Sequence, residues 1–139
     1  MTDDCIFCSI VSGTAPASVV HETDRVIAFM DIAPVTPGHM LVIPKAHSAD
    51  LVDVDPADAA EMMTAAQRMD AALRSSTVPT EGVNLFYADG EAAGQEVFHA
   101  HLHVFPRFAG DGFGLTVRTS APPPRAELDR LAGELTASW

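Results

Sequence analysis

Three histidines alternate with apolar residues within residues 97–107, and this pattern constrains the fold more than any other feature of the chain. His99, His101 and His103 are half of the six histidines in the sequence. In an extended strand successive side chains point to opposite faces, so the three imidazoles are expected to share one face. That face also carries Val97 and Phe105. The opposite face is apolar, which predicts that it packs on a core, and it consists of Phe98, Ala100, Leu102 and Val104.

Four interpretations of the three histidines are open. They are exposed side chains of a solvated sheet, or they form one metal centre together. A straight strand places the outer pair roughly 13 Å apart, which is too far for a single ion. A third interpretation is a histidine nucleophile or base that acts on phosphorus. The fourth is a mixture of roles, with one histidine on a metal and another in the chemistry.

The residues around the histidines favour phosphorus chemistry. Gly94 and Gln95 come just before the predicted strand, where backbone N–H groups and an amide can hold phosphate oxygens. His101 and His103 are near enough on one face to reach a single phosphoryl group. We expect a neutral His101 to attack, with a backbone carbonyl holding its other N–H and so fixing the tautomer. His103 would donate a hydrogen bond to a nonbridging oxygen.

Length and charge narrow the class of protein. The chain has 139 residues, of which 47% are hydrophobic, so we expect one domain with its own core. The net charge of −11 argues against binding to duplex nucleic acid, and local groups must hold any anionic substrate. The sequence carries neither a signal-peptide pattern nor a membrane-spanning apolar run, which predicts a cytoplasmic protein that does not bind membranes.

The remaining patterns predict an α+β fold with an antiparallel sheet of about five strands. The clearest helix begins after Asp55, with Pro56 at its first position and apolar residues at helical spacing up to Leu73. A short helix or knuckle at 5–11 and a C-terminal helix with leucines at 128, 131 and 135 are also expected. The predicted strands are residues 19–20, 25–30, 39–44, 82–87 and 97–107.

The cysteine pair Cys5-Ile6-Phe7-Cys8 is a weak signal by itself. It fits two buried, reduced cysteines, and it also fits half of a zinc site that needs two more ligands. Spacing does not choose among the histidines that could supply those ligands, which are His21, His39, His47, His99, His101 and His103.

Together, several motifs in this order resemble the histidine-triad (HIT) family. The segment 99–105 resembles its signature of three histidines separated by apolar residues, and the cysteine pair is also found in the family. Similar too are Ala28-Phe29-Met30-Asp31-Ile32, Pro37-Gly38-His39, Leu41-Val42-Ile43-Pro44-Lys45-Ala46-His47 and Ala93-Gly94-Gln95. The resemblance implies a HIT fold over residues 1–109. We expect residues 110–139, with a glycine-rich loop, a proline-rich connector and a short helix, to pack on the same domain.

The resemblance also implies a function. It predicts a homodimer that binds nucleotides such as AMP or GMP and acts at the α-phosphorus of a nucleoside phosphoramidate or dinucleoside polyphosphate. By position His101 is the nucleophile and His103 contacts the phosphate. Asp31 would bind the ribose hydroxyls and Ile32 would line the base pocket, while Gly94 and Gln95 would hold the phosphate or leaving group. A non-enzymatic, zinc-containing nucleotide-binding dimer is the alternative.

The same resemblance implies a structural zinc ion. Its ligands here would be Cys5, Cys8, His47 and His99, which removes His99 from catalysis and leaves His101 free. A fixed His99 would also clamp one end of the histidine strand.

Two positions depart from the pattern of many family members. Ala88 stands where an amide side chain is common, so one contact to phosphate or sugar is missing. Glu96 stands where Ser or Thr is common. A carboxylate there repels a phosphate leaving group and favours a leaving group that carries an amine.

Overall fold

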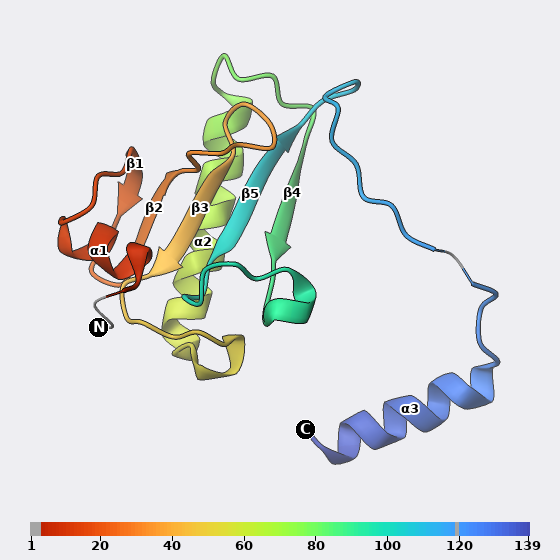
Figure 1. The fold of residues 1–139 in the computed structure, drawn as a ribbon. Helices are drawn as coiled ribbons and strands as arrows, with labels where there is room; N and C mark the ends of the chain where they lie inside the picture. Colours follow the sequence, from red (N-terminus) through yellow and green to blue (C-terminus); the bar gives the residue numbers. More distant parts are fainter. Residues whose placement is uncertain (1–3, 119) are drawn as a thin grey trace.

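A single antiparallel sheet of five strands organises the fold, and the computed structural model describes residues 4–118 and 120–139. Its strand order is β1-β2-β3-β5-β4, so the last two strands are exchanged relative to the chain order (Figure 1). The bounds are Val19–Glu22 for β1, Val26–Met30 for β2, Met40–Pro44 for β3, Gly82–Tyr87 for β4 and Leu102–Arg107 for β5. The expected α+β fold is confirmed.

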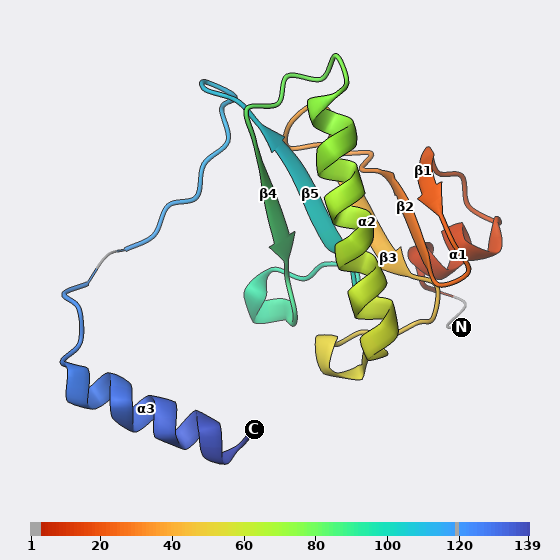
Figure 2. The same ribbon diagram turned by 180° about the vertical axis from the view of Figure 1, so that it is seen from behind.

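The long helix α2 (Pro56–Arg74) covers one face of the sheet (Figure 2). It begins as expected, because the side chain of Asp55 accepts a hydrogen bond from the N–H of Ala57 and Pro56 takes the first turn. Its apolar side packs on the even-numbered residues of β3 and β5, including Met40 and Val104. None of the helices in the described ranges is long and apolar enough to cross a membrane.

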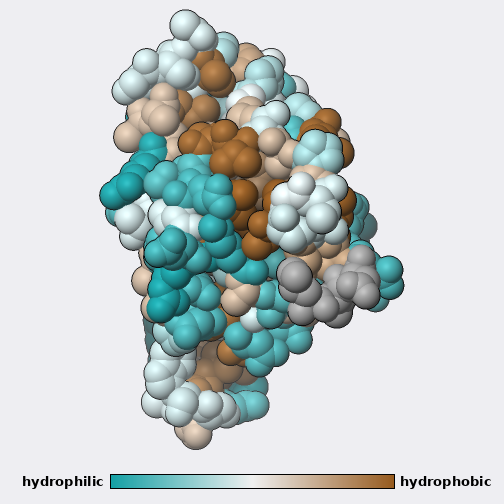
Figure 3. Space-filling view, turned by 90° about the vertical axis from the view of Figure 1, so that its left-hand side faces the viewer, coloured by the Kyte–Doolittle hydropathy of each residue, from teal (hydrophilic) through white to brown (hydrophobic). Residues whose placement is uncertain are grey.

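The opposite face of the sheet carries a second, smaller core under α1 (Ile6–Ser12). Phe7 packs there against Phe29 at 5.6 Å between ring centroids. Gly13 ends α1 with a φ of 80°, a left-handed conformation that glycine adopts without strain. At this edge of the molecule, where β1 and α1 lie, exposed hydrophobic side chains stand among hydrophilic ones (Figure 3).

The prediction of a strand over residues 97–107 is wrong for the first half of that segment. The strand β5 begins only at Leu102, and residues 97–99 form a bend. Ala100, Leu102 and Val104 pack on α2 as expected, but Phe98 is half exposed. The bend has a physical reason, because His99 leaves the plane of the sheet to join side chains from two other segments.

The C-terminal extension also differs from expectation. Residues 114–118 and 120–124 have no regular structure, and α3 (Arg125–Ala137) stands clear of the sheet in both ribbon views (Figures 1 and 2). None of the α3 residues is buried, and Leu135 is 68% exposed. Three consecutive prolines directly before α3 favour an extended backbone in this part of the connector. Two further short helices, Leu51–Asp53 and Glu91–Ala93, lie in loops.

Candidate functional site

A cavity of about 860 Å³ opens on the face of the sheet that α2 does not cover. Its walls are mostly apolar, and Phe29, Phe86 and Phe105 contribute aromatic rings. The polar side chains that reach it include those of Asp31, His101 and His103. A large apolar cleft with a few convergent polar groups is the usual form of a small-molecule site.

The backbone fixes the orientation and the tautomer of His101. Its Nδ1 lies 2.6 Å from the carbonyl oxygen of His99, and a carbonyl can only accept, so Nδ1 carries the proton. The Nε2 of His101 therefore keeps its lone pair. The ring is buried against Phe7 at 5.2 Å between centroids. This is the backbone carbonyl that the phosphorus interpretation required.

His103 stays uncharged at neutral pH. Burial, followed by the neighbouring His101 and His39, lowers the pKa of His103 from 6.5 to about 4. Its ring lies 4.9 Å from that of His101 and stacks on Phe105 at 5.5 Å. A neutral ring offers one N–H and one lone pair, so its hydrogen-bond partners decide which of the two faces the cavity.

Besides His103, three of the predicted nucleotide-binding residues lie at the cavity, and these are Asp31, Ile32 and Gly94. Asp31 follows β2, and its Oδ1 accepts a hydrogen bond from the N–H of Ala33. This bond holds the carboxylate in place and does not involve Oδ2. The side chain of Ile32 is fully exposed at the rim. Gly94 has a φ of 90°, and no heavy atom lies within 4 Å of the position that a Cβ would take there.

The structure places Gln95 elsewhere than expected. The side chain is buried, and Oε1 accepts the N–H of Gly90 at 2.7 Å. Its Nε2 donates to the carbonyl oxygens of Ala49 and Val97 at 3.0 and 3.1 Å. All of these bonds hold loop backbone together, so this amide serves the fold and not the cavity. Backbone groups in a glycine turn often lack backbone hydrogen-bond partners. An amide side chain that serves as their partner has no N–H left to donate to a ligand.

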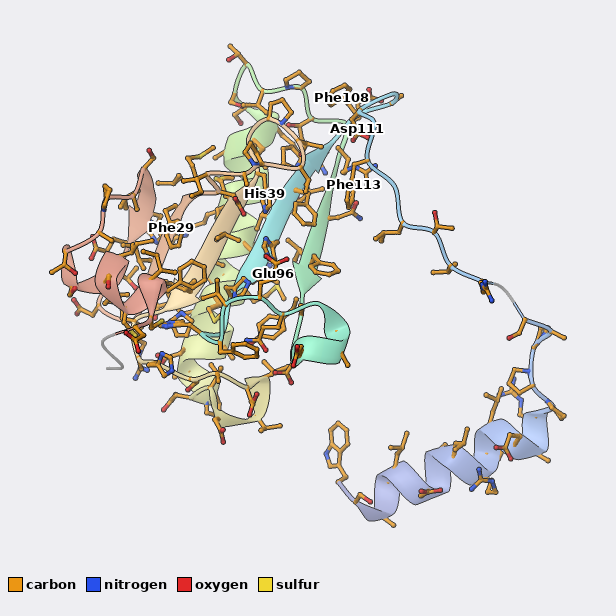
Figure 4. All side chains as sticks on the ribbon, in the orientation of Figure 1. Phe29, His39, Glu96, Phe108, Asp111 and Phe113 are labelled. Atoms are coloured by element: carbon orange, nitrogen blue, oxygen red, sulfur yellow. The ribbon has the colours of Figure 1, made fainter. Side chains whose placement is uncertain are left out.

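The neighbouring Glu96 lines the cavity in its place. Figure 4 shows its side chain on the face of the sheet that also carries His39 and Phe29. Ala88, the other departure from the family pattern, is buried instead of facing the cavity. A carboxylate is thus added to the cavity by Glu96, while the position of Ala88 is a packing position.

Among the described residues that line the cavity there is no lysine or arginine. Lys45 pairs with Glu22 at 2.8 Å. Arg107 pairs with Asp111, and its guanidinium holds the pKa of that carboxyl well below its usual range. An anion in this cavity would therefore be held by imidazoles and backbone N–H groups, not by a lysine or arginine side chain.

A second cluster lies beside the first and consists of Cys5, Cys8, His47 and His99. The Nδ1 of His99 is 3.5 Å from the Sγ of Cys5 and 3.6 Å from the Sγ of Cys8. The Nδ1 of His47 is 3.3 Å from the Sγ of Cys8 and 3.2 Å from the Nδ1 of His99. The four atoms come from α1 and its N-cap, the segment after β3 and the bend before β5.

These distances fit a tetrahedral zinc ion. With Zn–S near 2.3 Å and Zn–N near 2.05 Å, tetrahedral angles separate S from N by about 3.6 Å and N from N by about 3.3 Å. The Nε2 of His99 lies 2.8 Å from the carbonyl oxygen of Pro44, which places its proton there and leaves Nδ1 as the ligand atom. Burial lowers the pKa of His99 and so favours the neutral form that binds metals.

Sequence reasoning missed two residues of the cavity. His39 appeared only as one of several candidate zinc ligands, yet it lines the cavity and touches His103. Strand alternation could have found it, because His39 lies two residues before Leu41, which pairs with His103 across β3 and β5. Phe113 also reaches the cavity, from the loop that the Arg107–Asp111 ion pair holds (Figure 4). No regular pattern in the glycine-rich loop marked Phe113.

Comparison with known proteins agrees with these features. The family model described as "HIT domain" matches residues 12–110. A HIT-like protein of Borreliella burgdorferi is 46% identical over 112 residues, which is 80% of this chain and 81% of that protein. The crystal structure of a HIT family protein from Bacillus anthracis has a TM-score of 0.93 and 36% identity, with 100% of this chain and 99% of that chain covered.

Two further solved structures bear on the two clusters. A zinc-bound histidine triad family protein from Mycobacterium smegmatis is 43% identical, with a TM-score of 0.76 and 98% of each chain covered. A histidine triad nucleotide-binding protein from Candida albicans is 29% identical, with a TM-score of 0.87 and coverage of 97% of this chain and 96% of that chain.

Proposed function

Since the chain belongs to the HIT domain family, we propose that it is a nucleotide hydrolase or transferase that acts at the α-phosphorus of a nucleotide. The observation that carries this proposal is the pair of imidazoles at one cavity, the buried His101 and the half-buried His103, of which His101 keeps a lone pair on Nε2. The nucleotide-binding relative supports the ligand class. The substrates would be nucleoside phosphoramidates or dinucleoside polyphosphates.

The proposed reaction has two steps. The Nε2 of His101 attacks the α-phosphorus in line, and a nucleotidyl-His101 intermediate forms as the bond to the leaving group breaks. The leaving group departs with the electron pair of that bond, and a leaving amine takes up a proton from solvent. Water or another acceptor then attacks the same phosphorus, gives up its proton to solvent and releases His101. The N–H of His103 donates to a nonbridging oxygen, where negative charge develops in both transition states. The carbonyl of His99 stabilises the positive charge that His101 gains.

The cavity supplies the binding contacts of this proposal. Asp31 would accept hydrogen bonds from the ribose hydroxyls, and the base would lie near Ile32 among the apolar walls. The backbone at Gly94 would lie near the phosphate, and Gln95 would act only by holding that loop. Glu96 favours a leaving group that carries a positive charge, so a phosphoramidate whose leaving group bears a cationic amine is the substrate class that fits best.

Zinc at the cysteine cluster is the second part of the proposal. Cys5, Cys8, His47 and His99 would hold the ion, and their spacing and the zinc-bound relative support it. The ion would join α1 to the bend before β5. It would thereby hold the His99 carbonyl on which the tautomer of His101 depends.

A homodimer is the third part. Leu128, Leu131 and Leu135 of α3 are 39%, 40% and 68% exposed, and the described chain offers them no cover. A second copy would bury this apolar face. Light scattering of the full chain tests it, with a dimer expected and a monomer at micromolar concentration against it.

A substrate panel on the wild type and His101→Ala tests the function. We expect adenosine phosphoramidates and diadenosine polyphosphates to turn over in the wild type only. Full activity of His101→Ala contradicts the mechanism. Binding of AMP or GMP with no turnover of any substrate would instead favour the non-enzymatic nucleotide-binding dimer.

A further inference from the structure

His39 forms a cluster with Asp31 and His103 in the cavity wall, and the proposed reaction gives His39 no role. Their nearest ligand atoms all lie within 4.8 Å of one another, a spacing that suits either a metal ion or a chain of hydrogen bonds. The Nε2 of His39 is 2.8 Å from the Nδ1 of His103 and 3.4 Å from the Oδ2 of Asp31. A backbone hydrogen bond to His39 decides whether the cluster suits a metal ion or a chain of hydrogen bonds.

The N–H of Val35 donates to the Nδ1 of His39 at 3.2 Å. This bond occupies the lone pair of Nδ1, and a neutral imidazole has only one lone pair, so Nε2 of His39 must carry the proton. A metal ion needs a lone pair on that same Nε2. The hydrogen bond from Val35 therefore disfavours a metal at this cluster and makes Nε2 of His39 a donor.

The nearest acceptor for that proton is the Nδ1 of His103. His103 must then hold its own proton on Nε2, the nitrogen that remains for a ligand. The ring of His39 is buried and packs edge-on against Phe105 at 4.4 Å between centroids, so it has little freedom to turn away. Burial lowers the pKa of His39, which favours the neutral ring.

We infer that His39 is a positioning residue that fixes His103 as a hydrogen-bond donor to the phosphoryl group. The two neighbouring imidazoles then differ because their partners differ. The His99 carbonyl leaves His101 with a lone pair on Nε2, while the His39 N–H leaves His103 with a proton on Nε2. His39 thus prevents His103 from competing as the nucleophile. The donation from His103 to a phosphoryl group rests on the proposed function, but the position of the proton on His103 does not.

The test compares the wild type with three variants by ¹⁵N NMR of the histidine rings, without nucleotide and at neutral pH. In the wild type we expect the proton of His103 on Nε2. His39→Phe keeps a ring against Phe105 but removes the donor, so His103 should become a mixture of tautomers. His39→Gln retains an N–H near the position of Nε2 and should restore the wild-type tautomer. His103→Gln assigns the signals.

Kinetics with a phosphoramidate substrate complete the test. We expect kcat of His39→Phe to fall about tenfold with a smaller change in KM, and His39→Gln to recover most of the loss. A proton on Nδ1 of His103 in the wild type, or an unchanged tautomer in His39→Phe, overturns the inference. Co²⁺ added in excess of the amount that fills the cysteine cluster also overturns the inference if it broadens the His39 and His103 signals. The expected tautomers without any turnover would instead count against the proposed function.

Discussion

The Nδ1 of His101 lies 2.6 Å from the backbone carbonyl oxygen of His99, and this bond joins the two clusters of the molecule. The His99 side chain faces two cysteines, and its carbonyl sets the tautomer of the proposed nucleophile. A change at the cysteine cluster should therefore reach the cavity through the backbone of one residue. The bend at residues 97–99 makes this double use possible.

Removal of zinc is expected to lower the stability of the fold before it affects activity. The wild type should contain one zinc ion per chain, and Cys8→Ala should contain none, because its Sγ lies 3.3 and 3.6 Å from two other ligand atoms. Zinc at a hundred times its Kd stabilises a fold by about 2.7 kcal/mol, so a chelator should lower Tm. Metal analysis and calorimetry measure both effects.

His21→Ala is the matched control, because His21 lies on β1 outside the cluster. It should keep its zinc and its Tm. An activity that disappears on chelation while Tm stays constant would point to a catalytic metal and contradict the structural role.

Glu96→Gln is expected to change the preference for leaving groups. The neutral amide removes a negative charge from the cavity wall. We expect kcat/KM to fall about threefold to tenfold for a substrate with a cationic amine leaving group, and to rise for one with an anionic phosphate leaving group. Glu91→Gln in the same loop, outside the residues that line the cavity, should change neither. A change in the same direction for both substrates would rule out a charge effect.

Gln95→Leu is expected to act on folding and not on binding. It removes an amide whose oxygen and nitrogen hold backbone groups of Gly90, Ala49 and Val97, and it leaves those groups without a partner. The free energy of unfolding in urea should fall by about 1–3 kcal/mol, with KM almost unchanged in the folded protein. A tenfold rise in KM at unchanged stability would make Gln95 a ligand to the substrate after all.

The stability contributed by His103 should depend on pH. Its pKa is about 4 in the folded chain and 6.5 for an ordinary histidine, the value expected on unfolding, so the unfolded chain binds more protons between these values. This contribution is complete above pH 6.5 and is lost as the pH falls to about 4. Relative to His103→Gln, the wild type should lose about 1–3 kcal/mol over that range. Subtraction of the two titrations removes the shared effect of the cysteine cluster, and parallel curves would contradict the shift.

Local patterns predicted most of the fold. Alternation found the strands, and the cap at Asp55 placed the start of α2 correctly. The two failures have a common cause, because both depend on tertiary contacts that no local pattern encodes. Residues 97–99 bend to bring His99 to the cysteines, and the leucine spacing predicts an apolar face on α3 but not the surface that would cover it.

For the candidate site, local patterns identified the residue types but not their partners. The carbonyl beside His101 was expected from chemistry alone, whereas the Val35 N–H that orients His39 arises from the shape of a loop. Gln95 and Glu96 show the same limit. They are neighbours in sequence, and only the fold determines that the amide is buried and that the carboxylate lines the cavity.

In the proposed mechanism His101 becomes covalently attached to the nucleotide. Wild-type protein mixed with a nucleoside phosphoramidate and quenched in base, which preserves phosphorus–nitrogen bonds, should gain the mass of one nucleotidyl group by intact-mass measurement. Peptide mapping should place that mass on His101, and His101→Ala should show none. Turnover without any adduct under single-turnover sampling, or an adduct on another residue such as His103, would contradict the account.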